Sequence, residues 1–200
     1  MEEKGREELK SAFDIAMERA EKLGEESPEE IRKRDLIPQG ERLAARYLKG
    51  QCNLVVELGK YDDEDRGHVA EGVKGVLLRN LDVPKNNVVK RTNRAAMEGI
   101  KSLKQDKGGI ENVYSKLRRL FKHYEEEGLE QRRQAYEALK QDFYMNLQQL
   151  AQQQGVPAGI SIDVEHHPQF QEQWRLTLAK LDSQYRTLVE EYKREMESIP

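Results

Sequence analysis

The chain has 200 residues, of which 36% are charged and 36% hydrophobic, with a net charge of −3 and a mean hydropathy of −0.92. This length allows one domain or one and a half, and no stretch approaches the roughly 20 apolar residues that a membrane span needs. Cys52 is the only cysteine, which excludes an intramolecular disulfide. No secretory signal is visible, so we expect a cytoplasmic protein without membrane contact.

Apolar residues recur at intervals of three and four along most of the chain, which predicts helices rather than disorder. One helix should end at Gly24, the motif Ser27-Pro28-Glu29-Glu30 is a helix-start signature, and Pro38 should end the short helix that it opens. Gly72 and Gly75 predict a close approach between helices. The five helices expected in this half span residues 3–23, 28–37, 41–58, 62–81 and 86–105.

The longest helical run covers residues 110–154, after a break at residues 107–109. Its two halves are out of phase, and Gly128 lies at the step between them, so we expect a kink or a break there. Apolar and polar residues alternate over residues 160–164, which predicts one short strand. A last helix should cover residues 168–197.

The last helix carries a seam of large apolar residues at alternating intervals of three and four, which is typical of a helix that packs along another helix. The seam consists of Trp174, Leu178, Leu181, Tyr185, Leu188 and Tyr192. The charged residues between them, Asp182 included, are expected in water. At about 1.5 Å per residue, residues 129–154 form a partner of matching length, which predicts a coiled-coil-like antiparallel hairpin.

The expected fold is therefore all-α, with several short to medium helices followed by a long antiparallel two-helix hairpin. Residues 1–107 should form a multi-helix region and residues 108–200 the hairpin, unless the two form one continuous domain.

Three stretches carry a resemblance. Residues 11–24, 37–44 and 76–81 read SAFDIAMERAEKLG, IPQGERLA and VLLRNL. They are similar to an uncharacterised family of bacterial helical proteins, over about the first half of the chain. The resemblance includes no catalytic motif, and it implies a soluble helical protein of bacterial origin without an assigned activity.

Charge is distributed unevenly along the chain. Residues 85–122 hold 11 basic and 3 acidic groups, whereas residues 123–200 hold 8 basic and 14 acidic groups. The candidate phosphate-binding residues for RNA or DNA are Lys90, Arg94, Lys101, Lys104, Arg118, Arg119 and Lys122. We favour the alternative that this segment docks on acidic helices, within the molecule or across a dimer, because the total charge is negative and no nucleic-acid-binding motif is present.

Asp163, Glu165, His166 and His167 form a candidate metal site, with oxygen and imidazole ligands suited to zinc, manganese or iron. Their spacing matches no ligand motif, and the alternative is a polar loop ahead of a helix. The chain contains no phosphate-binding loop, nucleophile elbow or zinc-protease motif. We therefore expect neither an enzyme nor a bound cofactor.

The favoured function is a non-enzymatic interaction or scaffold protein that self-associates through the hairpin or binds another helical protein. Nucleic-acid binding by residues 85–122 and metal binding by residues 163–167 are the alternatives.

Overall fold

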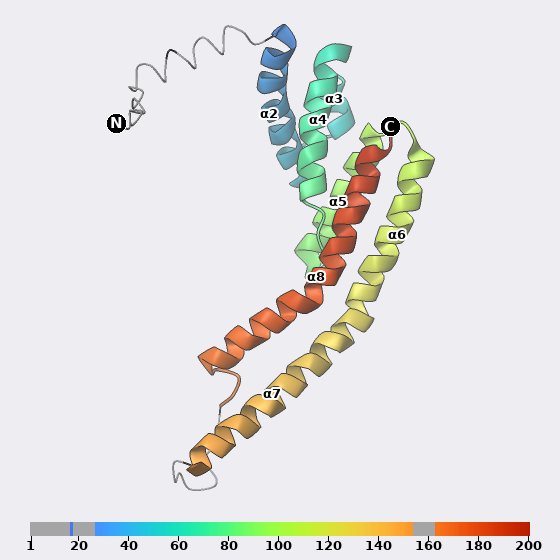
Figure 1. Ribbon diagram of the computed structural model, residues 1–200. Helices are drawn as coiled ribbons and strands as arrows, with labels where there is room; N and C mark the ends of the chain where they lie inside the picture. Colours follow the sequence, from blue (N-terminus) through green and yellow to red (C-terminus); the bar gives the residue numbers. More distant parts are fainter. Residues whose placement is uncertain (1–16, 18–26, 154–162) are drawn as a thin grey trace, which may run out of the picture. The chain divides into compact units, whose positions relative to one another are not determined.

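The computed structural model describes residues 17, 27–153 and 163–200, and its regular elements are all helices (Figure 1). This confirms the all-α class for the part of the chain that is described. The first predicted helix, residues 3–23, lies outside the described residues except for Met17. The chain divides into two compact units, residues 1–75 and residues 76–200, and each is described by itself below.

The first unit contains α2 (Pro28–Leu48), α3 (Leu54–Leu58) and most of α4 (Asp63–Arg79). The predicted start signature opens α2. The Ser27 hydroxyl accepts a hydrogen bond from the Glu30 backbone N–H at 3.2 Å, and the Glu30 carboxylate accepts one from the Ser27 N–H at 2.7 Å. This reciprocal pair gives partners to two backbone donors that the helix itself leaves unpaired.

Pro38 does not end α2, so the prediction of a helix stop at this residue was wrong. The helix continues to Leu48, and its buried side runs through Leu36, Gly40 and Leu43 on both sides of the proline. A proline inside a helix costs about 3 kcal/mol. The buried face therefore outweighs a local preference that the sequence shows clearly.

The predicted helix over residues 41–58 is interrupted. Gly50 has a φ of +70°, a left-handed conformation that favours glycine, and α2 ends just before it. Asn53 then caps α3, its side-chain oxygen accepting a hydrogen bond from the Val56 N–H at 3.2 Å. A turn therefore separates two helices where apolar spacing alone predicted one.

Two glycines let α2 and α4 approach closely within the first unit. A Cβ on Gly40 would overlap the carbonyl oxygen of Val69 and lie 2.9 Å from the carbonyl carbon. A Cβ on Gly72 would overlap the carbonyl oxygen of Ile37 and lie 3.0 Å from its carbon. The close approach predicted from Gly72 is confirmed, and it brings one helix backbone against the other.

The second unit begins with the last turn of α4 and continues with α5 (Asn87–Leu103) and α6 (Lys107–Glu125). Residues 107–109, predicted as a break, form the first turn of α6, because the Asp106 carboxylate accepts a hydrogen bond from the Gly109 N–H at 2.8 Å. The predicted region boundary at residue 107 thus falls at a turn inside this unit.

The long run divides into α6 and α7 (Glu127–Gln153), with the junction at Glu126. The kink or break expected at Gly128 is thereby confirmed, two residues earlier than the glycine. The last helix, α8 (Pro168–Ser198), packs against both α6 and α7 (Figure 1). The simple two-helix hairpin therefore stays a prediction, because α8 is shared by two partners.

The core of the second unit lies between α5, α6 and the carboxyl-terminal half of α8. Fully buried side chains come from all three helices, for example Ile100, Leu117 and Met196. The ammonium group of Lys104 fixes the end of α8, since it donates to the carbonyl oxygens of Glu197 and Ile199.

The short strand predicted over residues 160–164 finds no support in the part that is described. Residues 160–162 lie outside the described residues, and Asp163 and Val164 are in no regular element. None of the described helices combines the length and the apolar composition that crossing a bilayer requires.

Candidate functional site

The predicted seam of α8 is only partly covered by the rest of the chain. Of its six residues, Tyr185 is buried and Leu188 is 38% exposed. The other four are half-buried: Trp174, Leu178, Leu181 and Tyr192. The side of α8 that is buried is rotated from the predicted seam, because Asp182, Val189 and Met196 lie on it. The expectation that Asp182 is in water was wrong.

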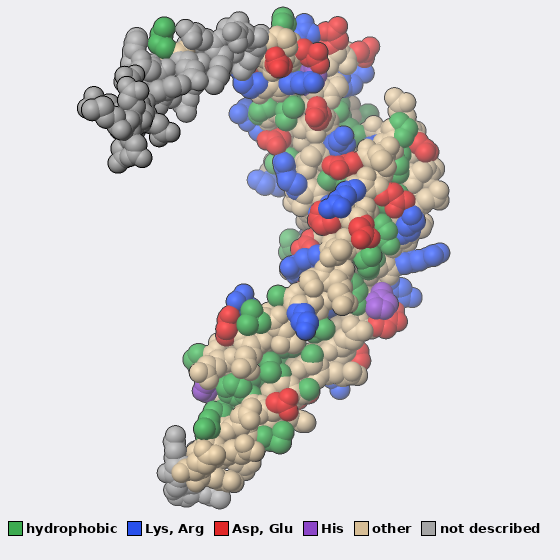
Figure 2. All heavy atoms as spheres, in the orientation of Figure 1, with side chains coloured by type: hydrophobic (Ala, Val, Ile, Leu, Met, Phe, Trp, Pro, Cys, Tyr) green, Lys and Arg blue, Asp and Glu red, His purple; other side chains and the backbone are tan. Residues whose placement is uncertain are grey.

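The extent to which the apolar residues of α8 are buried by neighbouring helices differs along its length. Where α8 lies on α6, its apolar residues Val189 and Met196 are 2% and 0% exposed. Along α7, the seam residues Trp174, Leu178 and Leu181 stay half-buried, and Figure 2 shows hydrophobic side chains gathered between the two helices on the face in view. We call α7 together with residues 168–182 of α8 the arm. The two helices bury a cluster of Phe143, Val164 and Phe170 between them but leave the seam residues beyond it partly open.

Aromatic side chains hold the arm together at its far end. Tyr136 of α7 meets Phe170 and Trp174 of α8 edge-on, with ring centroids 5.6 and 5.1 Å apart, and Phe143 meets Phe170 at 5.7 Å. Such edge-to-face pairs contribute about 0.5–1.5 kcal/mol beyond their buried area. The two helices of the arm are therefore specifically paired, and their remaining surface is well defined.

The exposed surface at the end of α7 is nearly without charge, and most of its side chains are uncharged amides. Residues 141–153 contain a single charged residue, Asp142, in a chain that is 36% charged. Tyr144, Met145 and Leu150 are 42%, 52% and 51% exposed there. Depletion of charge beside exposed aromatic residues and methionine is typical of the centre of a protein interface.

A buried charge pair lies where α6 passes into α7. The Arg132 and Asp182 side chains are 13% and 6% exposed, and their nearest polar atoms, Nη1 and Oδ1, are 3.6 Å apart. Neither atom has a hydrogen-bond partner among the described residues. Arg132 also donates to the Tyr124 carbonyl at 2.9 Å, and its guanidinium lies 4.0 Å from the centroid of the Tyr124 ring. We call Tyr124, Arg132, Asp182 and Tyr185 the bend cluster.

Tyrosines complete the bend cluster. The Tyr124 and Tyr185 rings meet edge-on at 5.1 Å, and the Tyr185 hydroxyl lies 2.9 Å from Nδ1 of His123. Gly128 leaves the space for this hydroxyl, since a Cβ there would lie 2.8 Å from it. Burial raises the pKa of Tyr124 to about 12, with the nearby Asp182 carboxylate adding to the rise and Arg132 opposing it.

The free energy of unfolding should fall between pH 10 and pH 12, because the unfolded chain loses the Tyr124 proton in this window while the folded chain keeps it. A difference of one between the folded and unfolded pKa is worth about 1.4 kcal/mol. Tyr124→Phe should remove this part of the pH dependence. Urea unfolding of both proteins at several pH values checks it, and parallel curves for the two would contradict the assignment.

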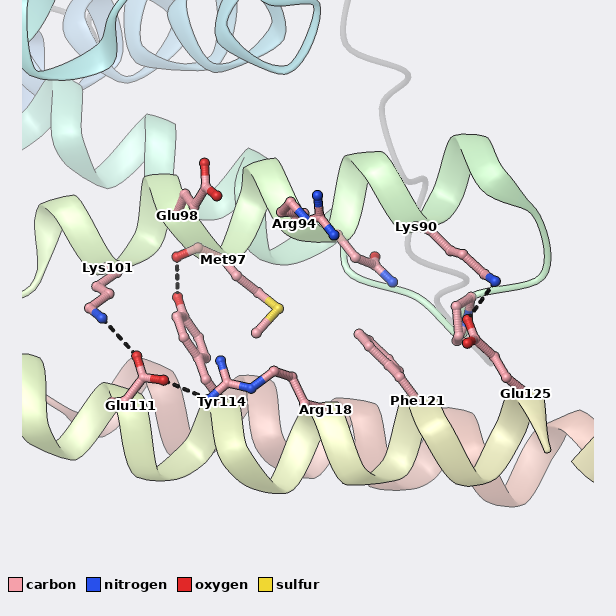
Figure 3. A pocket seen from close by; sticks show the side chains of 12 residues that line it. Lys90, Arg94, Met97, Glu98, Lys101, Glu111, Tyr114, Arg118, Phe121 and Glu125 are labelled. Atoms are coloured by element: carbon pink, nitrogen blue, oxygen red, sulfur yellow. Dashed lines mark hydrogen bonds and ion pairs between the residues drawn. The ribbon is translucent and has the colours of Figure 1, made fainter. Parts of the chain in front are cut away.

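A groove between α5 and α6 collects most of the predicted phosphate-binding residues. It has a volume of about 590 Å³, and Lys90, Arg94, Lys101 and Arg118 line it. Figure 3 shows Met97 reaching from α5 and Phe121 from α6 toward the space between them. The groove thus combines an apolar floor with charged edges.

Most of these basic side chains form ion pairs with acidic residues. Lys101 and Arg118 lie 2.7 and 2.6 Å from the same carboxylate, that of Glu111, and Lys90 lies 2.9 Å from Glu125 (Figure 3). Glu111 belongs to the basic segment itself, so its pairs are not docking on an acidic helix, whereas Lys116 of this segment lies 2.6 Å from Glu195 and so pairs with the last helix, α8. Arg94 forms no ion pair with any residue that the structure describes.

The remaining three candidates do not join this groove. Lys104 is buried beneath the end of α8, so it cannot belong to an exposed phosphate-binding surface. Arg119 lines a different hollow, next to Leu188 of the seam. Lys122 is exposed and lies 3.9 Å from Glu126. The structure therefore does not bring the seven basic residues together on one surface.

The four candidate metal ligands point to different partners. Asp163 pairs with His166 at 2.8 Å, whereas Glu165 pairs with Lys140. The His167 ring packs against Phe143 with centroids 5.0 Å apart. Across the described ranges no three histidine, cysteine or acidic residues gather as metal ligands would, so the predicted site is not formed there.

Sequence reasoning missed two features, the bend cluster and the uncharged end of α7. Arg132 and Asp182 resemble surface charges when each is read in its own helix, and only the pairing of the helices shows that they meet. The low charge of residues 141–153 is visible in the sequence, and it is the signal by which the exposed surface could have been found.

A comparison with known families places this chain. A model of a family of unknown function (DUF6657) matches residues 55–198, which include α5 to α8, and no curated protein or solved structure matches. Of the three stretches that carried the resemblance, residues 76–81 lie inside the match. The expected membership of an uncharacterised family is thereby confirmed: the chain belongs to the DUF6657 family of unknown function.

Proposed function

We propose that this protein is a non-enzymatic interaction protein that self-associates through the arm. One observation supports the proposal above all others: the seam residues Trp174, Leu178 and Leu181 remain half-buried between two helices, and the adjoining end of α7 is nearly uncharged. The second copy would lay its own arm on this face. The product would be a four-helix bundle, an arrangement that encloses such a seam between facing helices.

Burial supplies the driving force for this association. Each apolar side chain moved from water into an interface contributes about 25 cal/mol for every Å² that it buries. The charge-poor surface of residues 141–153 lowers the opposing cost, because few charged groups would lose water on contact. The aromatic pairs between Tyr136, Phe170 and Trp174 hold the surface rigid before contact, so little conformational entropy is lost.

The experiment is a mass measurement by light scattering on the full chain over a range of concentrations. We expect the mass to approach twice the 23.3 kDa of one chain and to fall on dilution. Leu150→Glu should weaken association at least about tenfold, since Leu150 is exposed on the side of α7 that carries Phe143 and the substitution would bury an unpaired carboxylate. The matched control is Val88→Glu, which places the same charge at a residue that is 61% exposed on α5, outside the arm.

Circular dichroism should show equal helix content in both variants, because both substitutions are at exposed positions. A wild-type mass of one chain at the highest concentration would contradict self-association. Equal weakening by the two variants would contradict the role of the arm.

A further inference from the structure

We infer that the groove between α5 and α6 is a binding site for a small amphiphilic anion, with an apolar chain or ring on its floor and a carboxylate or phosphate head at Arg94. This site lies outside the arm and does not depend on self-association. The groove has a volume of about 590 Å³, within the range of about 300–1,000 Å³ that is usual for small-molecule sites.

The floor of the groove is suited to an apolar group. Met97 and Tyr114 are 9% and 2% exposed, Pro84 is buried, and Phe121 is half-buried. Tyr114 donates its hydroxyl hydrogen to the Met97 carbonyl, so its ring presents carbon to the groove while its polar atom has a partner. Met97 and Phe121 reach toward each other from opposite helices (Figure 3) and can hold a chain between them.

The charged side chains that line the groove favour a ligand with an anionic head group. Four cations and three carboxylates line the groove, and the Glu98 carboxylate turns away from α6 (Figure 3). Of the cations, Lys101 and Arg118 share one carboxylate, that of Glu111. Arg94 is exposed and forms no ion pair with the described residues. A guanidinium binds carboxylate or phosphate through two parallel hydrogen bonds, which makes Arg94 the natural anchor.

The ion pairs set the length of the ligand. The Lys90–Glu125 pair lies at one end and the Lys101–Glu111–Arg118 group at the other. At 1.5 Å per residue along α5, the space from Lys90 to Lys101 is about 16 Å long. With the head group at Arg94, the part from Arg94 to Lys101 is about 10 Å long, which suits a medium-length alkyl chain. The ion pairs are exposed and individually weak, so they can open to admit a ligand.

The test is calorimetric titration of the full chain with decanoate, at concentrations at which it forms no micelles. We expect saturable binding by decanoate, and none by inorganic phosphate or by decyltrimethylammonium, which has the same tail and the opposite charge. Arg94→Gln should weaken decanoate binding about tenfold or more, because it removes a charge-assisted hydrogen bond. Phe121→Ala should weaken it through loss of apolar contact.

Two controls separate this site from a general effect of charge. Arg91→Gln removes an exposed arginine of the same helix that does not line the groove, and it should leave the affinity unchanged. Glu98→Gln should leave it unchanged or raise it. Equal binding of the cationic amphiphile, an equal loss in Arg91→Gln, or no binding of decanoate would each overturn the inference. Leu150→Glu should bind decanoate as the wild type does, so failure here is distinct from failure of self-association.

Discussion

Gly72→Ala should disrupt the packing of α2 against α4 in the first unit, because the added methyl group would occupy the place of a backbone atom. A Cβ there would overlap the carbonyl oxygen of Ile37, and a helix backbone cannot move aside as the end of a flexible side chain can. Overpacking in a well-packed core costs about 1–3 kcal/mol and occasionally more, and we expect about 3 kcal/mol or more here. Amide hydrogen exchange of α2 and α4 is the measurement.

Gly67→Ala is the matched control on the same helix. A Cβ at Gly67 meets nothing within 4 Å, so the substitution should stabilise α4 by roughly 0.5–1 kcal/mol through its higher helix propensity. Equal exchange rates in the two variants would show that α2 and α4 do not approach as closely as the contact of Gly72 with Ile37 requires.

Asp182→Ala should destabilise the second unit by about 3–5 kcal/mol, because it leaves the Arg132 charge buried without an opposite charge. Arg132 is 13% exposed and Asp182 6%, so water can replace little of the lost interaction. Unfolding in urea followed by the fluorescence of Trp174, the only tryptophan, reports this unit directly. Asp142→Ala, which removes an exposed aspartate of α7, should change the stability by less than about 0.5 kcal/mol.

The double variant Arg132→Met with Asp182→Leu separates two explanations. If the charges matter chiefly because one cannot be buried alone, the double variant should recover most of the stability that Asp182→Ala loses. A double variant as unstable as the single one would mean instead that the bend cluster depends on the polar contacts themselves, including the bond from Arg132 to the Tyr124 carbonyl.

The sequence predicted correctly those elements that are determined by residues close to each other in the chain. The capping box at Ser27, the break near Gly128 and the long last helix all follow from residues that act within a few positions of each other. Pro38 is the opposite case, since its local preference is overruled by a buried face that continues on both sides of it. A sequence shows the preference but not the contacts that oppose it.

The buried face of α8 could not be predicted from the spacing of its large residues. Those residues follow a period of 3.5, the repeat of a supercoiled pair, whereas a straight helix turns once in 3.6 residues and drifts away from such a seam. Leu188 is therefore left 38% exposed while Val189 is 2% exposed. Asp182 lies on the buried side, where it pairs with Arg132. This pairing could not be predicted from either helix alone, because the two residues belong to different helices.

The sequence indicated a seam on α8 as the candidate interface, but it did not indicate which side of this helix is buried. The seam residues were expected to be buried, and their half-buried state along α7 is the observation from which we propose a role in association. Charge blocks in the sequence suggested docking between basic and acidic segments, whereas Lys101 and Arg118 pair with Glu111 inside the basic segment, and Lys116 pairs with Glu195 of α8. The exposed residues of α7 could be assigned to the candidate surface only once the pairing of the helices was known.

Trp174 provides the most direct test of the proposed self-association, because this half-buried residue lies on the seam that a second copy would cover. The measurement is acrylamide quenching of its fluorescence over a range of protein concentrations. Quenching should decrease as the concentration of wild-type protein rises and stay constant in Leu150→Glu. Quenching that is independent of concentration in the wild type would contradict an interface on the arm, even for a protein whose mass doubles.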